Sequence, residues 1–460
     1  MKRLVAAVFL LAACAFAETP AVIAIRNARI VTVSGPVIGK GTVVIRNGLI
    51  ESVGESPAAP AEAMVVDGEG MTVYPGLIDA LSTVGMPASA LAAAPAATAG
   101  RGGGRSPATP ATAVTATPAA RSMGPEDRPQ TTSWLLAADE LQPSDRRIET
   151  IRGAGVTTAV VFPTRGIFAG QGAVIDLMAA ERSGQMVVDS PAGQYIALGR
   201  SGFGGFGGGF PSALMGMIAY VHQTYLDADH YKLVKEAYAK NPRGMERPPY
   251  DRALEGVLDS KRILLPANRL VEIDRMIRFA AEIKQPVILY GGREAYRPEA
   301  ADLLKKSGVP LLVSLHWPTP PAGPDTHLEE ESMRQLQTYD QAPAAPAILQ
   351  KAGARFALYS DGVETPRDFQ RAVKKALDAG LTRDQALRAL TLSPAEIYGV
   401  ADRLGSIEKG KIGNLVVTRG EIFDNNTKVE MIIVDGRKYT PAADTTGGRG
   451  AGTETPGGNQ

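Results

Sequence analysis

Few side chains in this sequence could bind a catalytic metal. Among its 460 residues there are one cysteine, Cys14, and four histidines, His222, His230, His316 and His327. A catalytic zinc site normally needs three protein ligands. His222 and His230 fall in one helical stretch eight residues apart, whereas ligand pairs on helices favour a spacing of four, so packing or solvent exposure explains both more simply. His327 lies in a Pro/Gly loop beside three glutamates, which predicts a solvated side chain.

His316 and four other side chains follow apolar runs and could contact a substrate or take part in its chemistry. His316 ends the run 309–316 and is the histidine best placed for substrate contact. Asp361 ends the run 355–361 and could act as a general base, or could simply hydrogen-bond neighbouring loops. Arg165, Asn268 and Arg293 could bind a polar ligand, with salt bridges among loops as the alternative interpretation.

A glycine motif does not indicate nucleotide binding. Residues 202–207 match GxGxxG, but they lie within a Gly/Phe run. Asp227 and Asp229, some twenty residues further on, fall inside a predicted helix, whereas the dinucleotide fingerprint needs its acidic residue at the end of a strand. The sequence contains no Walker motif, HExxH or GxSxG.

Alternating strands and helices must position these side chains. The predicted strands are 157–163, 262–268, 286–292, 309–316 and 355–361, and the predicted helices are 144–154, 215–238, 271–284, 295–307, 331–353, 367–379 and 382–399. Short apolar strands without polar alternation are typical of a parallel sheet buried on both faces. In a barrel of such units the strand carboxyl ends share one face, where active sites lie.

The two ends of the chain carry a second kind of pattern. β-Branched runs at 21–33 and 42–54, with an Asn47-Gly48 turn, have counterparts at 405–417 and 429–439. We therefore predict an α/β fold in which a (β/α)8 TIM-like barrel is inserted into a small β-sandwich domain built from both chain ends. The predicted segments are 1–17, a signal peptide; 18–74 with 400–440, the composite domain; 75–399, the barrel, with low-complexity insertions at 85–130 and 199–210; and 441–460, a disordered tail.

Charge and the N-terminus limit the partners and the compartment. The formal net charge of +1 gives no electrostatic case for nucleic acid. Lys2-Arg3, an apolar run and Ala15-Phe16-Ala17 predict a signal peptide and an exported protein, periplasmic or secreted. Lipoprotein anchoring through Cys14 is the open alternative. No later segment reaches transmembrane length without charges.

Five segments occur in a specific order and spacing: the hairpin 47–54, Pro-Gly-Leu-Ile-Asp at 75–79, and the stretches 155–177, 392–417 and 432–437. Together they resemble the amidohydrolase superfamily, particularly its imidazolonepropionase-like and related exported members, and the resemblance covers most of residues 21–440. It implies a barrel flanked by a β-sandwich, with one or two divalent metals, zinc being the family expectation, at the barrel's carboxyl-terminal face. The implied chemistry is metal-assisted hydrolysis of amide and other C–N bonds.

The sequence departs from this family at the metal ligands. The family pattern continues PGLID-x-His-x-His, but Leu81 and Thr83 occupy the two histidine positions, and Pro266 replaces a histidine at the end of the fifth strand. Tyr290 ends the sixth strand without a histidine. Asp361 is retained, and in active relatives this residue binds metal and takes a proton from the attacking water. We assign no metal ligands and no cofactor.

Three functions follow from these observations. The resemblance predicts a hydrolase acting on C–N bonds with a degenerate metal site, with Asp361 catalytic and His316, Arg165, Arg293 and Asn268 in contact with substrate. The alternative is a catalytically inactive exported barrel that binds a small molecule or a protein. A third hypothesis is metal-free hydrolysis with Asp361 as base. The predicted partner is a small molecule rather than nucleic acid, and a homo-oligomer would match many family members.

Overall fold

The computed structural model describes most of the chain between residues 22 and 441. The described residues are 22–55, 57–92, 128–198, 210–211, 213–320, 331–363, 365–424 and 427–441. The predicted signal peptide, Cys14, His327, most of the 85–130 and 199–210 insertions and nearly all of the tail lie outside them. At the start of the first insertion, residues 85–92 are placed, and Met86 and Ala90 are buried, so this part differs from the flexible loop that we predicted.

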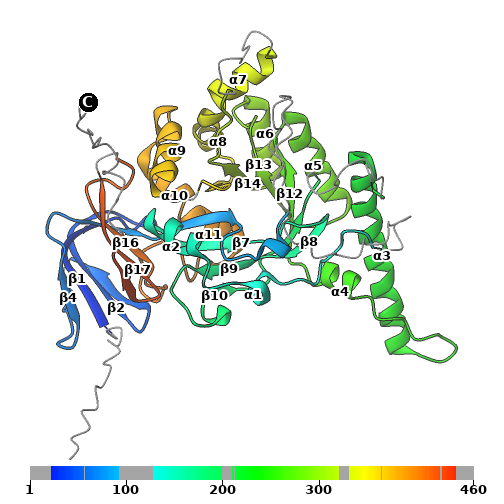
Figure 1. The fold of residues 1–460 in the computed structure, drawn as a ribbon, viewed down its shortest axis with the longest axis horizontal. Helices are drawn as coiled ribbons and strands as arrows, with labels where there is room; N and C mark the ends of the chain where they lie inside the picture. Colours follow the sequence, from blue (N-terminus) through cyan, green and yellow to red (C-terminus); the bar gives the residue numbers. More distant parts are fainter. Residues whose placement is uncertain are drawn as a thin grey trace, which may run out of the picture.

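An eight-stranded sheet combines both ends of the chain (Figure 1). Its strand order is β18-β17-β16-β5-β1-β2-β3, and β4 pairs with β1. At the turn between β2 and β3, Asn47 and Gly48 have φ values of 49° and 80°, which suits a tight hairpin turn. The strands are β1 (Val22–Ile30), β2 (Ile38–Arg46), β3 (Leu49–Gly54), β4 (Met64–Asp67), β5 (Thr72–Pro75), β16 (Leu415–Arg419), β17 (Lys428–Val434) and β18 (Arg437–Tyr439).

The middle of the chain forms two further sheets. One has the order β10-β9-β7-β6 and the other β15-β14-β13-β12-β11-β8. Neighbouring strands from β11 to β15 pair in parallel, as do β6 and β7. These strands are β6 (Leu77–Ser82), β7 (Val156–Val161), β8 (Phe168–Gln171), β9 (Ala173–Asp176), β10 (Val187–Asp189), β11 (Gln194–Ile196), β12 (Ile263–Ala267), β13 (Val287–Gly291), β14 (Leu311–Ser314) and β15 (Phe356–Tyr359). The predicted single barrel ladder is therefore divided between two sheets.

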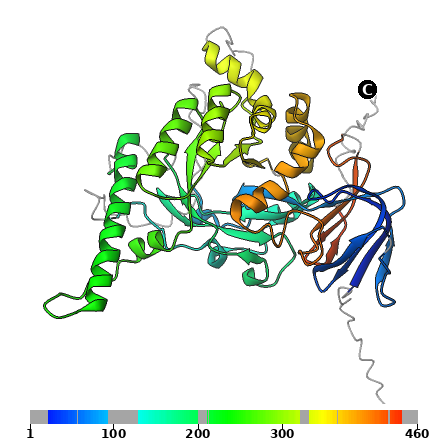
Figure 2. The same ribbon diagram turned by 180° about the vertical axis from the view of Figure 1, so that it is seen from behind.

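Helices follow the strands and cover the six-stranded sheet on one side (Figures 1 and 2). The α-helices of the described chain are α1 (Ala137–Glu140), α2 (Arg146–Gly153), α3 (Leu214–Lys240), α4 (Arg252–Leu258), α5 (Leu270–Glu282), α6 (Pro298–Ser307), α7 (Met333–Gln341), α8 (Ala345–Ala352), α9 (Pro366–Asp378), α10 (Arg383–Ala389) and α11 (Leu392–Tyr398). No helix in these described segments is long and apolar enough to cross a membrane.

One predicted helix, 382–399, is two helices in the structure. Helix α10 ends at Ala389, and Thr391 has a non-helical backbone with φ −135° and ψ −83°. Pro394 then lies in the first turn of α11, where a missing N–H is tolerated. In one continuous helix the same proline would lack the bond to the carbonyl of Leu390 and would clash with it, which explains the break.

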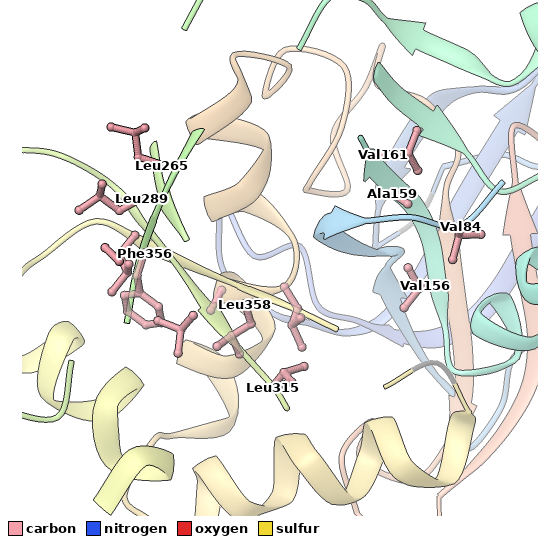
Figure 3. Close-up of a cluster of buried hydrophobic side chains, with 14 of the residues drawn as sticks. Val84, Val156, Ala159, Val161, Leu265, Leu289, Leu315, Phe356 and Leu358 are labelled. Atoms are coloured by element: carbon pink, nitrogen blue, oxygen red, sulfur yellow. The ribbon is translucent and has the colours of Figure 1, made fainter. Parts of the chain in front are cut away.

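Side chains of the central strands alternate between two hydrophobic clusters. The outer cluster lies on the helix-covered side and includes Val161, Leu265, Leu289 and Leu358 (Figure 3). The inner cluster takes the residues between them, including Ile78, Val160, Leu264, Ile288, Leu312 and Ala357. Because strand residues alternate in direction, and because this inner cluster draws on both sheets, the two sheets face each other across it.

A buried carboxylate joins the central strands to the eight-stranded sheet. Asp176 Oδ1 accepts hydrogen bonds from Thr158 Oγ1 at 2.9 Å and from Asn414 Nδ2 at 2.7 Å. Asn414 Oδ1 in turn accepts the backbone N–H of Asp435 at 2.8 Å. Burial raises the pKa of Asp176 to about 7, and the nearby Asp435 adds to the shift while Arg403 opposes it.

Replacing Asp176 with asparagine should make stability less dependent on pH. An acid whose pKa rises on folding contributes stability below its unfolded value, and that contribution is lost as pH increases through its folded value. For Asp176 this window runs from 3.8 to about 7. At about 1.4 kcal/mol per pKa unit, the change amounts to a few kcal/mol. In urea unfolding, the free energy of unfolding of Asp176→Asn relative to that of the wild type should therefore be higher at pH 8 than at pH 5.

Asp302→Asn, at an exposed helix position, is the matched control and should follow the wild type. Unfolding free energies of the Asp176→Asn variant that run parallel to those of the wild type across this pH range would contradict the prediction.

Candidate functional site

The predicted catalytic carboxylate and the best-placed histidine lie together. Ser314, the last residue of β14, donates a hydrogen bond from Oγ to Asp361 Oδ2 at 2.7 Å and accepts one from the backbone N–H of His316 at 3.0 Å. His316 Nδ1 is 3.2 Å from the backbone oxygen of Asp361. Both His316 and Asp361 are exposed. The result is a solvent-facing carboxylate whose orientation is fixed by a buried serine.

The backbone at Asp361 is also constrained. Its φ is 50°, in the left-handed region that aspartate and asparagine visit more readily than most residues. Such conformations cost free energy and occur often at functional sites. An asparagine at this position would remove the charge and keep the backbone preference.

A second carboxylate, Asp79, bonds the residue that follows β15. Asp79 on β6 accepts two hydrogen bonds from Ser360, one from the backbone N–H at 2.8 Å and one from Oγ at 2.6 Å. Its side chain is buried, and burial raises its pKa to about 6 although the bonds from Ser360 lower it. Asp79 therefore positions the residue immediately before Asp361.

Three tyrosines lie on the inner side of these strand ends. Tyr195 on β11 and Tyr290 on β13 stack with ring centroids 5.1 Å apart, and Tyr290 donates its hydroxyl to the backbone oxygen of Ile196 at 3.2 Å. Tyr359 ends β15 and is buried. Burial raises the pKa of Tyr195 to about 12, and the negative charge of Asp361 adds to that shift. All three hydroxyls are therefore neutral at ordinary pH.

The positions at which the resemblance implies metal ligands hold other contacts. Leu81 is only 7% exposed and belongs to the inner cluster. Thr83 Oγ1 accepts a hydrogen bond from Arg147 at 3.2 Å. Pro266 is paired in register with Tyr290. Among the residues that the structure describes, no group of three or more His, Cys, Asp or Glu could hold a metal ion. These residues do not fit the metal that the family implies.

The other predicted substrate contacts are spread around the strand ends. Arg293 is exposed, and its positive charge partly opposes the rise that burial causes in the pKa of Tyr359. Asn268 is half-buried, and its side-chain oxygen fills the space beside Gly291, where a Cβ would come within 2.4 Å of it. Arg165 is exposed and donates to the backbone oxygen of Ser89 at 3.3 Å. Among the described residues, no hydrogen bond or ion pair joins Arg165, Asn268 or Arg293 to Asp361.

The two helical histidines lie away from this site. His222 on α3 is half-buried, with Nε2 3.5 Å from Glu282 and its ring 6.5 Å from that of Phe279. His230, on the same helix, is exposed. Packing and solvent exposure account for them, as the sequence analysis expected.

Five residues of this site were not predicted from the sequence: Asp79, Ser314, Ser360, Tyr195 and Tyr359. Ser314 and Tyr359 could have been found, because each follows an inner-cluster residue by two positions on its strand, and period-two positions share a face. Tyr195 lies on a strand of only three residues, which is too short to give a pattern. Ser360 could not be predicted, because its partner Asp79 is 281 residues away in the sequence.

Removing the Ser360 hydroxyl should destabilise the protein measurably. Ser360→Ala leaves Asp79 buried with only one of these two hydrogen bonds, and a deficient buried acceptor costs about 1–3 kcal/mol. Urea unfolding at pH 7 should show a loss of that size. Ser307→Ala, which removes an exposed serine hydroxyl, should lose much less. Equal stability of the two variants would refute the structural role of the Asp79 contact.

Comparisons with known proteins show which family this chain resembles in sequence. A model of the amidohydrolase family matches residues 281–439. Urease subunit alpha 1 of Streptomyces avermitilis is 28% identical over 187 residues, covering 34% of this chain and 33% of the relative, so the match spans about a third of that curated relative's length.

Solved structures extend the similarity over nearly the whole chain. An amidohydrolase from Thermotoga maritima MSB8 has a TM-score of 0.69 and 28% identity, covering 90% of this chain and 99% of that chain. Molinate hydrolase has a TM-score of 0.53 and 16% identity, covering 95% and 100%, and this second likeness concerns the fold alone. With the matched family model and the structural likeness taken together, the chain belongs to the amidohydrolase superfamily.

Proposed function

We propose that this amidohydrolase-superfamily protein has a degenerate metal site and binds a small polar molecule at the Asp361 strand end. The observation that carries the proposal is the set of side chains at the implied ligand positions. Leu81 has no donor atom, Pro266 has none on its side chain, and Thr83 is engaged with Arg147. A site with one carboxylate falls short of the three protein ligands of a catalytic zinc.

The arrangement around Asp361 suits ligand binding. Its carboxylate is exposed and held by Ser314, so little side-chain entropy remains to be lost when a ligand binds. His316 adds a ring nitrogen beside it, and Arg293 adds a positive charge near Tyr359. A molecule with both hydrogen-bond donors and an acceptor group would match these side chains.

Metal-independent hydrolysis of a C–N bond is the second candidate. It is favoured by one observation: Asp361 is exposed, oriented and located at the strand end where a general base would reach a bound water. A positioned base contributes roughly 10²–10⁴-fold to a rate, far less than a metal-activated hydroxide together with a polarised carbonyl. We therefore expect any such activity to be slow.

The same reasoning extends to the architecture. We infer that the two central sheets are the halves of a (β/α)8 barrel, since one inner cluster draws on both and Asp79 connects β6 to the end of β15. We also propose that residues 18–74 and 400–440 form a composite β-sandwich domain and that residues 1–17 direct export. Both of these parts of the proposal rest on the sequence pattern.

Purified protein should not retain stoichiometric zinc. After incubation with zinc and dialysis, elemental analysis should find far less than one equivalent per chain, because Leu81, Thr83 and Pro266 supply no ligand set. The triple variant Leu81→His, Thr83→His, Pro266→His serves as a comparison for gained affinity. Near one tightly held equivalent in the unaltered protein would overturn the proposed degenerate site.

Asp361→Asn should separate binding from hydrolysis. Ligands are first sought by thermal shift in a panel of dipeptides, lactams and amino acids, and hydrolysis of each is then followed by chromatography. We expect bound ligands to lose about tenfold or more in affinity when the charge is removed, given about 1.5–3 kcal/mol for a charged hydrogen bond. Turnover that disappears in Asp361→Asn and remains in Asp302→Asn would favour the hydrolase candidate. Unchanged ligand affinity in Asp361→Asn would contradict the proposed site.

A further inference from the structure

The Asp361 carboxylate has one oxygen engaged and one available to a ligand. Its Oδ2 accepts the hydroxyl of Ser314 at 2.7 Å. Among the residues that the structure describes, no hydrogen bond or ion pair reaches the other oxygen, Oδ1. The Asp361 side chain is exposed, and the bond from the buried Ser314 limits its rotation. Oδ1 is therefore an oriented acceptor on an exposed side chain.

The contact between His316 and the backbone of Asp361 creates a second acceptor. Nδ1 of His316 lies 3.2 Å from the backbone oxygen of Asp361. A carbonyl oxygen can only accept, so Nδ1 carries the proton in this contact. In the neutral imidazole the other nitrogen, Nε2, is then unprotonated and accepts a hydrogen bond. Because the His316 side chain is exposed, these strand ends offer a ligand two acceptors, one of them charged.

The charges around Asp361 favour a cation over an anion. Burial raises the pKa of Tyr195 and Tyr359, and the negative charge of Asp361 raises it further, so both hydroxyls are neutral at ordinary pH. The positive charge of Arg293 opposes part of the rise at Tyr359, but within the described chain it forms no ion pair with Asp361. An anionic group at Oδ1 would meet the like charge of Asp361, whereas a cationic group would be attracted to it.

We propose that the ligand group recognised here is a protonated primary amine, whose N–H groups donate to Asp361 Oδ1 and to His316 Nε2. An ammonium group carries a positive charge and three donors, so one nitrogen can serve both acceptors. A guanidinium pairs best with both oxygens of a carboxylate, and Oδ2 already accepts from Ser314. This inference rests on the proposed function, because it names the class of molecule that binds at the Asp361 strand end.

The test compares two probes of the same size on the full chain. L-Alanine amide and L-lactamide share one carbon skeleton and differ in carrying an amino group or a hydroxyl. An amine with a pKa of about 8 is mostly protonated at pH 7. Titrations followed by NMR at that pH should show L-lactamide binding about tenfold more weakly than L-alanine amide, the loss expected for a hydrogen bond to a charged group.

Two variants locate the amine. Asp361→Asn removes the charge and should weaken binding of L-alanine amide about tenfold while changing that of L-lactamide little, so that the preference for the amine is lost. His316→Phe removes the neutral acceptor and should cost L-alanine amide roughly threefold. Asp302→Asn, at an exposed helix position, is the control and should bind both probes as the wild type does.

Failure of this inference can be told apart from failure of the proposed function. If L-lactamide binds as tightly as L-alanine amide and Asp361→Asn weakens both, the amine is overturned and the Asp361 site stands. If neither probe binds, or if Asp361→Asn leaves the preference for L-alanine amide unchanged, the amine is also overturned. The ligand panel then decides the site itself, because a ligand of any class that loses affinity in Asp361→Asn supports it.

Discussion

A buried contact between β6 and the end of β15 fixes the geometry on which the candidate site depends. Asp79 has both of its oxygens occupied by Ser360, and a buried carboxylate is tolerated only when such bonds are made. The contact joins residues 281 positions apart, across the gap where the two central sheets share no strand pairing. Because Ser360 is immediately followed by Asp361, the same bonds set where the exposed carboxylate stands. A contact that the fold requires therefore also determines the position of the Asp361 carboxylate.

Aromatic and aliphatic side chains pack on the inner side of the strands that end near Asp361. Phe162, Tyr195 and Tyr290 form a chain of ring contacts, at 5.9 Å and 5.1 Å between successive centroids, and Leu81 belongs to the same inner cluster. Interiors pack at a density that leaves few voids larger than a water molecule. The aromatic and aliphatic side chains at these positions supply no imidazole or carboxylate group. At this end of the strands, Asp361, His316 and Arg293 are the predicted site residues that meet solvent.

Sequence reasoning found the strands whose patterns are long and apolar. Runs of four to seven buried residues gave β12 to β15 within about two residues. The paired β-branched runs gave β1 to β3, β17 and β18 and the first residues of β16, but not β4 or β5. It missed β8 to β11 because three or four residues are too few for a periodicity, and it merged α10 with α11 because Pro394 suits a first turn as well as a break. The site was predictable at Asp361 and His316, which end apolar runs, but not at Asp79, since no local pattern reveals a partner so distant in sequence.

The proposed degenerate metal site can be understood from a difference between two kinds of functional residue. A metal ligand has the metal as its main partner, so replacing it with a side chain such as Leu81 or Tyr290 loses no protein contact and buries apolar surface, which stabilises the fold. Asp79 and Ser360 contact each other, so loss of either leaves buried polar atoms of the other unsatisfied at about 1–3 kcal/mol. Stability alone therefore favours loss of the ligands and retention of the residues that hold Asp361. The carboxylate remains oriented because the fold needs its neighbours, whether or not a reaction needs the carboxylate.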